Sequence, residues 1–181
     1  MPANNIQQYT FSDQDRLFFD TNVWFFIYGP QSHSDERRQR IYSNAFREIF
    51  SRRSRIFIDV LVLAEFVNRM ARFYFDFWCE DNKLTPNYKD FRSMDEFKPI
   101  ASEIEKAAQM ILVDSTPIET GFSRMNISAL LKAFENSQQD FNDLVIVNIC
   151  QTNRLTLVTD DSDFRSANIP ILTSNNRLLN P

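Results

Sequence analysis

The chain has 181 residues, of which 43% are hydrophobic and 14% aromatic, and its formal net charge is −4. These values indicate one globular domain with a sizeable core and exclude a disordered chain. With only two glycines, two cysteines and one histidine, Gly-rich phosphate loops and ordinary structural zinc sites are excluded as well.

The first predicted elements are a strand and a short helix. A flexible lead-in over residues 1–15 precedes a buried strand at Arg16–Phe19. Thr21-Asn22 then leads into an apolar helix at Val23–Tyr28. Gly29-Pro30 is expected to end this helix, because both residues favour turns.

The next predicted elements are a helix, a strand and a second helix. Either Ser34 or Asp35 is the expected N-cap of a helix that runs to about Ser51, with apolar residues at helical spacing. A strand at Arg55–Ile58 and a helix at about Val60–Phe75 follow, and the aspartate between them can cap the helix.

The rest of the chain contains an aromatic-rich insertion at about residues 72–99, within which Trp78–Phe97 has an irregular pattern. Strands alternating with helices predict an α/β fold, a single domain over residues 16–181 with a parallel sheet covered on both faces. The remaining elements are, in order, a helix from Asp95 or Ser102 to about Val113, a connection at Asp114–Gly121, helices at Asn126–Phe134 and from Asp140 to about Thr152, and strands at Arg154–Val158 and Ala167–Thr173.

Acidic side chains follow the apolar runs at several points along the chain. Because the functional crevice of an open α/β sheet lies at the carboxyl ends of its strands, these acids could meet at one edge. They are Asp20 after the first strand, Glu65 in the second turn of a helix, Asp143 in the first turn of another, and Asp160, Asp161 and Asp163 after a later strand.

Each of these acids also has an ordinary structural explanation. Asp140 and Asp143 form a pair like a capping box, and the helix dipole favours both. Glu65 could pair with Arg69 one turn later, and Asp160–Asp163 could be a polar turn. These explanations treat each acid separately, so they do not account for the position that the acids share near the ends of strands.

A converged cluster of carboxylates requires cations. Two like charges about 4 Å apart cost on the order of 4 kcal/mol at an effective dielectric constant near 20. Oxygen ligands without His or Cys favour Mg²⁺ or Mn²⁺ over Zn²⁺. Such ions activate water and stabilise charge on a phosphate, so the first hypothesis is a metal-dependent phosphodiesterase.

Four segments resemble, in order, the motifs of PIN-domain ribonucleases. They are Phe19-Asp20-Thr21-Asn22, the Leu-Val-Leu-Ala run that ends at Glu65, the segment Asp140–Asp143, and Val158–Phe164. The ordered set spans most of the chain. This resemblance implies a three-layer sandwich with a mainly parallel sheet of about five strands, and a Mg²⁺- or Mn²⁺-dependent endoribonuclease acting on single-stranded or structured RNA.

The resemblance also implies roles for individual residues. Asp20, Glu65, Asp143 and Asp161 match the family's metal-coordinating catalytic acids, and Asp163 matches its accessory catalytic acid. Supporting positions are matched by Asn22 and Thr159, which would orient the site, and by Asp140 as an outer group. Asp160 occupies a variable position and is not expected to be a ligand.

Within the family, the chain is most similar to VapC-type toxins, which a small antitoxin protein holds inactive. It is longer than the typical toxin, and the surplus lies between Arg72 and Phe97. The aromatic side chains of this stretch could form a homodimer or antitoxin surface, or they could extend the core. They are Phe73, Tyr74, Phe75, Phe77, Trp78, Tyr88, Phe91 and Phe97.

The stretch from Asp35 to Arg55 is strongly basic, with seven arginines against three acidic residues. Such a stretch can follow an RNA backbone, or it can be a solvated helix surface. The candidate RNA-binding residues are Arg37, Arg38, Arg40, Arg47, Arg52 and Arg53.

Two other functions stay open beside the ribonuclease. A non-catalytic PIN-like module could bind RNA or protein, although all four core acids are present. A phosphatase with an Asp-x-Asp nucleophile is disfavoured because Asn22 stands at the second Asp. We expect no membrane association, since no apolar run is long enough, and a cytoplasmic, reduced protein with unpaired cysteines.

Overall fold

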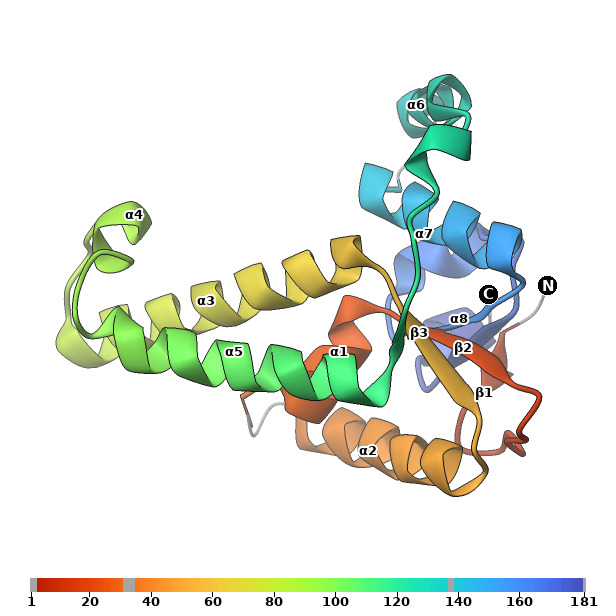
Figure 1. Ribbon diagram of the computed structural model, residues 1–181, viewed down its shortest axis with the longest axis horizontal. Coiled ribbons are helices and arrows are strands. Elements are labelled where there is room, and N and C mark those ends of the chain that lie inside the picture. Colours follow the sequence, from red (N-terminus) through yellow and green to blue (C-terminus); the bar gives the residue numbers. More distant parts are fainter. Residues whose placement is uncertain (1–2, 31–34, 137–138, 181) are drawn as a thin grey trace.

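The computed structural model describes residues 3–30, 35–136 and 139–180 (Figure 1). Its sheet has six strands in the order β1-β6-β5-β2-β3-β4, and every neighbouring pair is parallel. The α/β fold with a parallel sheet is therefore confirmed, with six strands where about five were expected. The strands are β1 (Asn4–Asn5), β2 (Arg16–Phe19), β3 (Arg55–Ile58), β4 (Thr116–Pro117), β5 (Thr156–Val158) and β6 (Ile171–Thr173).

Helices flank the sheet on both sides, with α1 and α2 on one side and α7 on the other (Figure 1). None of the described helices is both long and apolar enough to cross a membrane. The α-helices are α1 (Thr21–Tyr28), α2 (Glu36–Ser51), α3 (Val60–Asn82), α4 (Tyr88–Phe91), α5 (Phe97–Asp114), α6 (Ile127–Asn136), α7 (Phe141–Asn153) and α8 (Asn176–Leu179), and the 3-10 helices are η2 (Phe122–Arg124) and η3 (Ser162–Ser166).

The strand order reverses between β2 and β5. From β2 the chain moves outward to β3 and β4, whereas from β5 it moves in the opposite direction to β6. Phe19 at the end of β2 pairs with Val158 at the end of β5, so the segments that follow these strands leave the sheet side by side. A reversal of this kind opens a crevice at the carboxyl ends of the strands.

Short buried strands position this edge. Leu17, Phe18 and Phe19 of β2 are at most 1% exposed, as expected for a strand covered on both faces. Asp59, predicted as a cap, accepts a hydrogen bond from the backbone N–H of Leu61 at 2.7 Å and begins α3. Of the two proposed caps for α2, Asp35 occupies the position and Ser34 lies outside the described residues.

The N-terminal segment differs from the flexible lead-in expected for residues 1–15. Asn4 and Asn5 pair with β6 and add an edge strand to the sheet. Ile6 and Phe11 are each 2% exposed and belong to the main core. The polar composition of the segment concealed this packing, because its few apolar side chains are widely spaced; Ala3 and Tyr9 also pack against the core.

The aromatic-rich insertion is an arm formed by α3, α4 and α5, with α4 at its tip (Figure 1). The predicted end of the third helix was wrong, since α3 continues to Asn82 where Lys83 adopts a left-handed conformation. Phe91 is fully buried at the tip, although it was placed in an irregular stretch. Its ring contacts three other aromatic side chains, those of Phe75, Trp78 and Phe97.

These contacts favour the core-extension interpretation for most of the insertion. Phe91 is not itself part of the main core of the domain, but Phe97, which its ring contacts, packs against that core. Phe77, in contrast, is 62% exposed on α3. The arm therefore extends the main core through an aromatic cluster at its tip, and it leaves several large apolar side chains on its surface, among them Phe77, Leu84 and Val113.

Candidate active site

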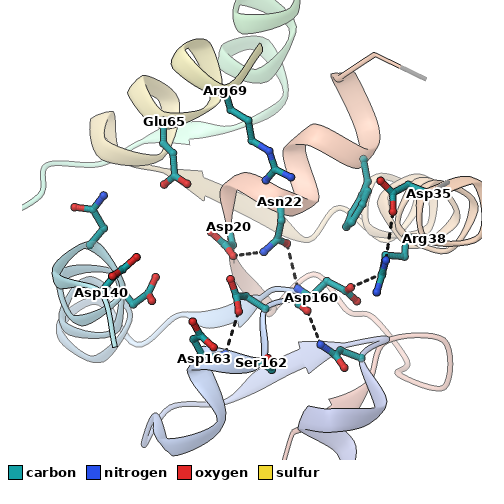
Figure 2. A pocket seen from close by; sticks show the side chains of 15 residues that line it. Asp20, Asn22, Asp35, Arg38, Glu65, Arg69, Asp140, Asp160, Ser162 and Asp163 are labelled. Carbon is teal, nitrogen blue, oxygen red and sulfur yellow. Dashed lines mark hydrogen bonds and ion pairs between the residues drawn. The ribbon is translucent and has the colours of Figure 1, made fainter. Parts of the chain in front are cut away.

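Eight acidic side chains line one cavity at the reversal point of the sheet, and Figure 2 shows several of them around Asp20. The cavity has a volume of about 390 Å³. Its acids come from the caps of α1 and α2, from α3, from the start of α7 and from the segment after β5, so five parts of the chain contribute. They are Asp20, Asp35, Glu65, Asp140, Asp143, Asp160, Asp161 and Asp163. The structure thus brings together every predicted acid.

Asp20 is the most buried of these acids, with 6% of its surface exposed. As N-cap of α1, its Oδ1 accepts a hydrogen bond from the backbone N–H of Thr21 at 2.7 Å. Its Oδ2 accepts from the hydroxyl of Thr159 at 2.7 Å and from the side-chain amide of Asn22. The carboxylate is therefore held in one orientation by donors from two strand ends.

Asn22 and Thr159, the predicted orienting residues, connect the two loops of the site. The Asn22 Oδ1 accepts from the backbone N–H of Asp160 at 3.1 Å. The Thr159 hydroxyl oxygen accepts from the backbone N–H of Asp161 at 3.0 Å. Asp161 in turn caps η3 by accepting from the backbone N–H of Asp163 at 3.0 Å. One network thus fixes the position of three acids.

The electrostatics reflect the crowding of carboxylates. Burial raises the pKa of Asp20 to about 6, with further increases from the charges of Glu65 and Asp161, although hydrogen bonds from Thr159 and Thr21 oppose the shift. Burial raises the pKa of Asp143 to about 7, and the charges of Asp20, Asp161, Asp140 and Asp163 add to it. Raised pKa values of clustered carboxylates in a cavity are typical of functional sites.

Asp160 lies at the same cavity but its carboxylate is already bound. The guanidinium of Arg38 contacts it at 2.6 Å, and the hydroxyls of Tyr42 and Ser174 donate to it at 2.9 and 3.0 Å. It therefore serves as an anchor between α2 and the loops after β5 and β6.

The candidate RNA-binding arginines do not gather in one place. Arg38 lines the acidic cavity, and with Arg37 and Arg177 it lines an adjoining cavity of about 420 Å³. Arg52 and Arg53 follow the other end of α2, about 20 Å along the helix axis, where the chain enters β3 at the opposite edge of the sheet. Arg47 lies toward that end, and Arg40 is exposed but lines neither cavity.

Sequence reasoning missed three residues that complete the site. Arg69 lines the cavity beside Glu65, yet no ion pair joins these two described residues; its guanidinium lies 4.4 Å from the ring centre of Phe25. Asn175 donates to the backbone oxygen of Asp160 at 2.6 Å. It follows β6, so the strand-end rule could have found it, whereas Tyr42 looked like an ordinary core residue.

The donor set fits a hard divalent cation, because it consists of carboxylate oxygens. The described acids surround the cavity without converging, since no three His, Cys, Asp or Glu side chains among them are grouped closely enough to hold a metal ion. The two described cysteines are unpaired, and Cys150 is buried. A cation site would therefore form as side chains close on the ion.

The comparison with known families decides the identity of the fold. The model of the PIN domain matches residues 17–170. The chain belongs to the PIN domain family. PIN domains are generally nucleases, and the matched segment contains every acid of the cavity. The predicted resemblance is thereby confirmed.

A solved structure supports the same fold for this PIN domain. A chain from the VapBC2 complex of Rickettsia felis bound to a DNA fragment from their promoter superposes with a TM-score of 0.54 at 14% sequence identity. The match covers 87% of this chain and 98% of that chain. A search among curated proteins finds no significant match.

Proposed function

We propose that this PIN domain is a metal-dependent endoribonuclease that cleaves single-stranded or structured RNA in the cytoplasm. The observation that carries the proposal is the ring of carboxylates around one cavity at the reversal point of the sheet. Asp20, Glu65, Asp143 and Asp161 would hold Mg²⁺ or Mn²⁺. Bound there, such an ion supplies activation of water and neutralisation of charge on the phosphodiester.

The chain's own groups have separate tasks in this proposal. Asn22 and Thr159 hold the Asp20 carboxylate in place through the hydrogen bonds described above. Asp163 is exposed at the rim of the cavity, where its carboxylate can exchange protons with solvent. Asp140 adds negative charge beside Asp143 and strengthens the attraction for a cation.

An RNA substrate is supported by the basic cavity that adjoins the acidic one. The two cavities share Asp35, Arg38, Asp160 and Asn175. Arg37 and Arg177 line the basic side and make no ion pair with any residue that the structure describes. Free guanidinium groups beside a cation site suit a phosphate backbone that passes from one cavity to the next.

The test is cleavage of a fluorescent single-stranded RNA with Mg²⁺ or Mn²⁺ by the wild type and by Asp20→Asn. We expect Asp20→Asn to lose at least about a hundredfold in rate, as loss of a major electrostatic group does. Asp81→Asn, an exposed acid on the arm, is the matched control. Equal cleavage by wild type and Asp20→Asn would contradict the proposal, and no cleavage by any variant would favour a non-catalytic binding module.

The proposal extends to a toxin of a toxin–antitoxin pair, which the fold likeness to a VapBC2 chain supports. In that role a small antitoxin protein would bind the chain and block its site. Induced expression should stop bacterial growth, and the product of a neighbouring reading frame should restore it. Growth arrest that persists with Asp20→Asn would contradict a toxic nuclease activity.

A further inference from the structure

A third cavity, of about 340 Å³, lies beside the acidic one between α1, α2 and α3. We call it the Gln39 cavity, and its lining includes Phe25, Phe26, Gln39, Arg69, Phe73 and Asp76. Its volume lies in the range of about 300–1,000 Å³ that is typical of small-ligand sites. None of the functions assigned above uses Gln39, Phe73 or Asp76.

Gln39 is an unusual side chain for the interior of a domain. It is 9% exposed, so nine-tenths of its surface is covered by the protein. No hydrogen bond joins its amide to any residue that the structure describes, and it lines the cavity. An amide on a largely buried side chain needs hydrogen-bond partners, and here the cavity is the place where it can find them. A ligand with a donor and an acceptor would satisfy it.

The other walls suit a flat aromatic ring. Phe25 and Phe73 meet edge to face, with ring centres 6.0 Å apart. The Arg69 guanidinium lies 4.4 Å from the centre of the Phe25 ring. Aromatic rings and guanidinium planes are the surfaces on which proteins stack unpaired nucleobases. Asp35 and Asp76 balance the charges of Arg69 and Arg72 in the lining, so the cavity has no net charge and suits a neutral base.

The Gln39 cavity adjoins the acidic cavity. Phe26, Asp35 and Arg69 line both. Phe26 stacks on Tyr42 at 5.4 Å with the two rings nearly parallel, and Tyr42 anchors Asp160. This shared wall is therefore held firmly, and a base in one cavity would belong to a nucleotide next to the other.

We propose that the Gln39 cavity binds one unstacked nucleobase of the RNA strand, adjacent to the phosphodiester at the carboxylates, and that the Gln39 amide reads its edge. The inference rests on the proposed ribonuclease function and deepens it, since it makes cleavage depend on the base at one position beside the cut. A glutamine amide presents one donor group and one acceptor, a pair that distinguishes bases by their hydrogen-bonding edges.

The experiment measures binding of four fluorescent hexaribonucleotides, oligo(A), oligo(C), oligo(G) and oligo(U), to the full chain carrying Asp20→Asn, by anisotropy. Gln39→Leu removes the hydrogen-bonding groups and keeps much of the volume. Gln39→Glu replaces the amide donor with an acceptor. Gln151→Ala, at an exposed glutamine of α7, is the matched control. Thermal melting of each variant establishes that it is folded.

We expect one base to bind about tenfold more tightly than the weakest. Gln39→Leu should reduce the difference in affinity between the most tightly and the most weakly bound base to less than about threefold. Gln39→Glu should change which base is preferred, and Gln151→Ala should change neither property. The wild type should also cleave next to the preferred base in a mixed RNA, and Gln39→Leu should cut with less selectivity.

Three results would overturn the subsite. The first is a difference in affinity among the four bases that Gln39→Leu leaves unchanged, as expected if the cavity binds a protein partner instead. The second is an equal loss of affinity for all four bases, which would mean that the cavity positions the strand without reading it. The third is a wild type that cleaves with no base preference. Failure of the ribonuclease proposal itself is distinguishable, because wild-type cleavage would then be absent too.

Discussion

The hydroxyl of Thr159 donates a hydrogen bond to Asp20 at 2.7 Å and joins residues that are 139 positions apart in the sequence. The same hydroxyl oxygen accepts from the backbone N–H of Asp161. One side chain thus fixes two candidate ligands on neighbouring strand ends. It also opposes the burial that raises the pKa of Asp20.

Replacing Thr159 with valine should therefore weaken both the fold and the site. Loss of a buried hydrogen-bond donor and acceptor should lower the free energy of unfolding by about 1–3 kcal/mol. Urea unfolding measures this change, and RNA cleavage should fall with it. Thr159→Ser, which keeps the hydroxyl, should stay close to the wild type; equal behaviour of the two variants would argue that the hydroxyl is dispensable.

The raised pKa values of Asp20 and Asp143 predict how the stability of the metal-free protein depends on pH. Both folded values, about 6 and about 7, lie above the ordinary value of 3.8. Between these limits the folded state holds more protons than the unfolded state, so the free energy of unfolding falls as pH rises. Their contribution is fully present below about pH 4 and is lost by about pH 7.

Asp143→Asn should reduce this loss, because the amide carries no charge at any of these pH values. Urea unfolding in EDTA at about pH 5 and about pH 8 should show a smaller difference for the variant than for the wild type. Asp81→Asn, at an exposed acid of the arm, serves as the control. A pH dependence identical in all three proteins would contradict the electrostatic account of Asp143.

Divalent ions should stabilise the protein, and more strongly at higher pH. Protons compete with the ion for the carboxylates of Asp20 and Asp143, so binding tightens as these groups lose their protons. An ion at about a hundred times its dissociation constant adds about 2.7 kcal/mol to stability. Mn²⁺ should therefore raise the melting temperature at about pH 8, and it should raise it less at about pH 5.

The increase in melting temperature that Mn²⁺ causes should be lost in Asp143→Asn and retained in Asp81→Asn. A stabilisation that survives the loss of Asp143 would place the ion elsewhere on the protein. Removal of the ion with EDTA should return the wild type to its metal-free melting temperature.

Arg38 and Arg52 should differ in their effect on RNA binding, although both belong to the same basic stretch. Arg38 lines both the acidic and the basic cavity, whereas Arg52 lies beyond the other end of α2. In the Asp20→Asn background, Arg38→Gln should lower the slope of log affinity against log salt by about 0.7, the value for one phosphate contact on a single strand. Arg52→Gln should leave the slope unchanged, and a matching decrease would show that the strand also follows the far end of α2.

Phe91 should stabilise the arm without affecting the acidic cavity. Its ring is fully buried against Phe75, Trp78 and Phe97. Truncation of such a ring costs about 3–5 kcal/mol, and here the loss should be greatest at the tip because Phe91 lies outside the main core. Phe91→Ala should increase hydrogen exchange at the tip of the arm while the response of the melting temperature to Mn²⁺ persists. Loss of that response would mean that the arm and the site unfold together.

Local patterns in the sequence were sufficient to predict much of the fold. β2 and β3 were predicted with the bounds that they have, because short buried runs of Leu, Phe and Ile allow few other structures. Asp59 was predicted as a cap from its place between a strand and a helix. The ordered motifs identified the family, and the position of the acids after strands predicted their common cavity.

Contacts between distant residues decided the rest. Asp160 and Asp161 are neighbours in sequence, yet only the contacts of Asp160 with Arg38 and Tyr42 set its carboxylate apart as an anchor. The burial of Ile6 and of Phe91 depended on partners that no local pattern reveals. Arg38 and Arg52 belong to the same basic stretch of the sequence, but they lie near opposite ends of α2. The length of the helix therefore places them far apart in space.

The Gln39 cavity is the clearest example of what the tertiary structure alone provides. In the sequence, Gln39 is one polar residue among arginines at the start of a helix. In the structure, it is 9% exposed and lines a cavity with side chains of α1 and α3, next to the acids. The sequence determined which groups are available for chemistry, because residue types and strand ends are local properties. The tertiary structure determined which of them meet, because burial and distance depend on the packing of the whole chain.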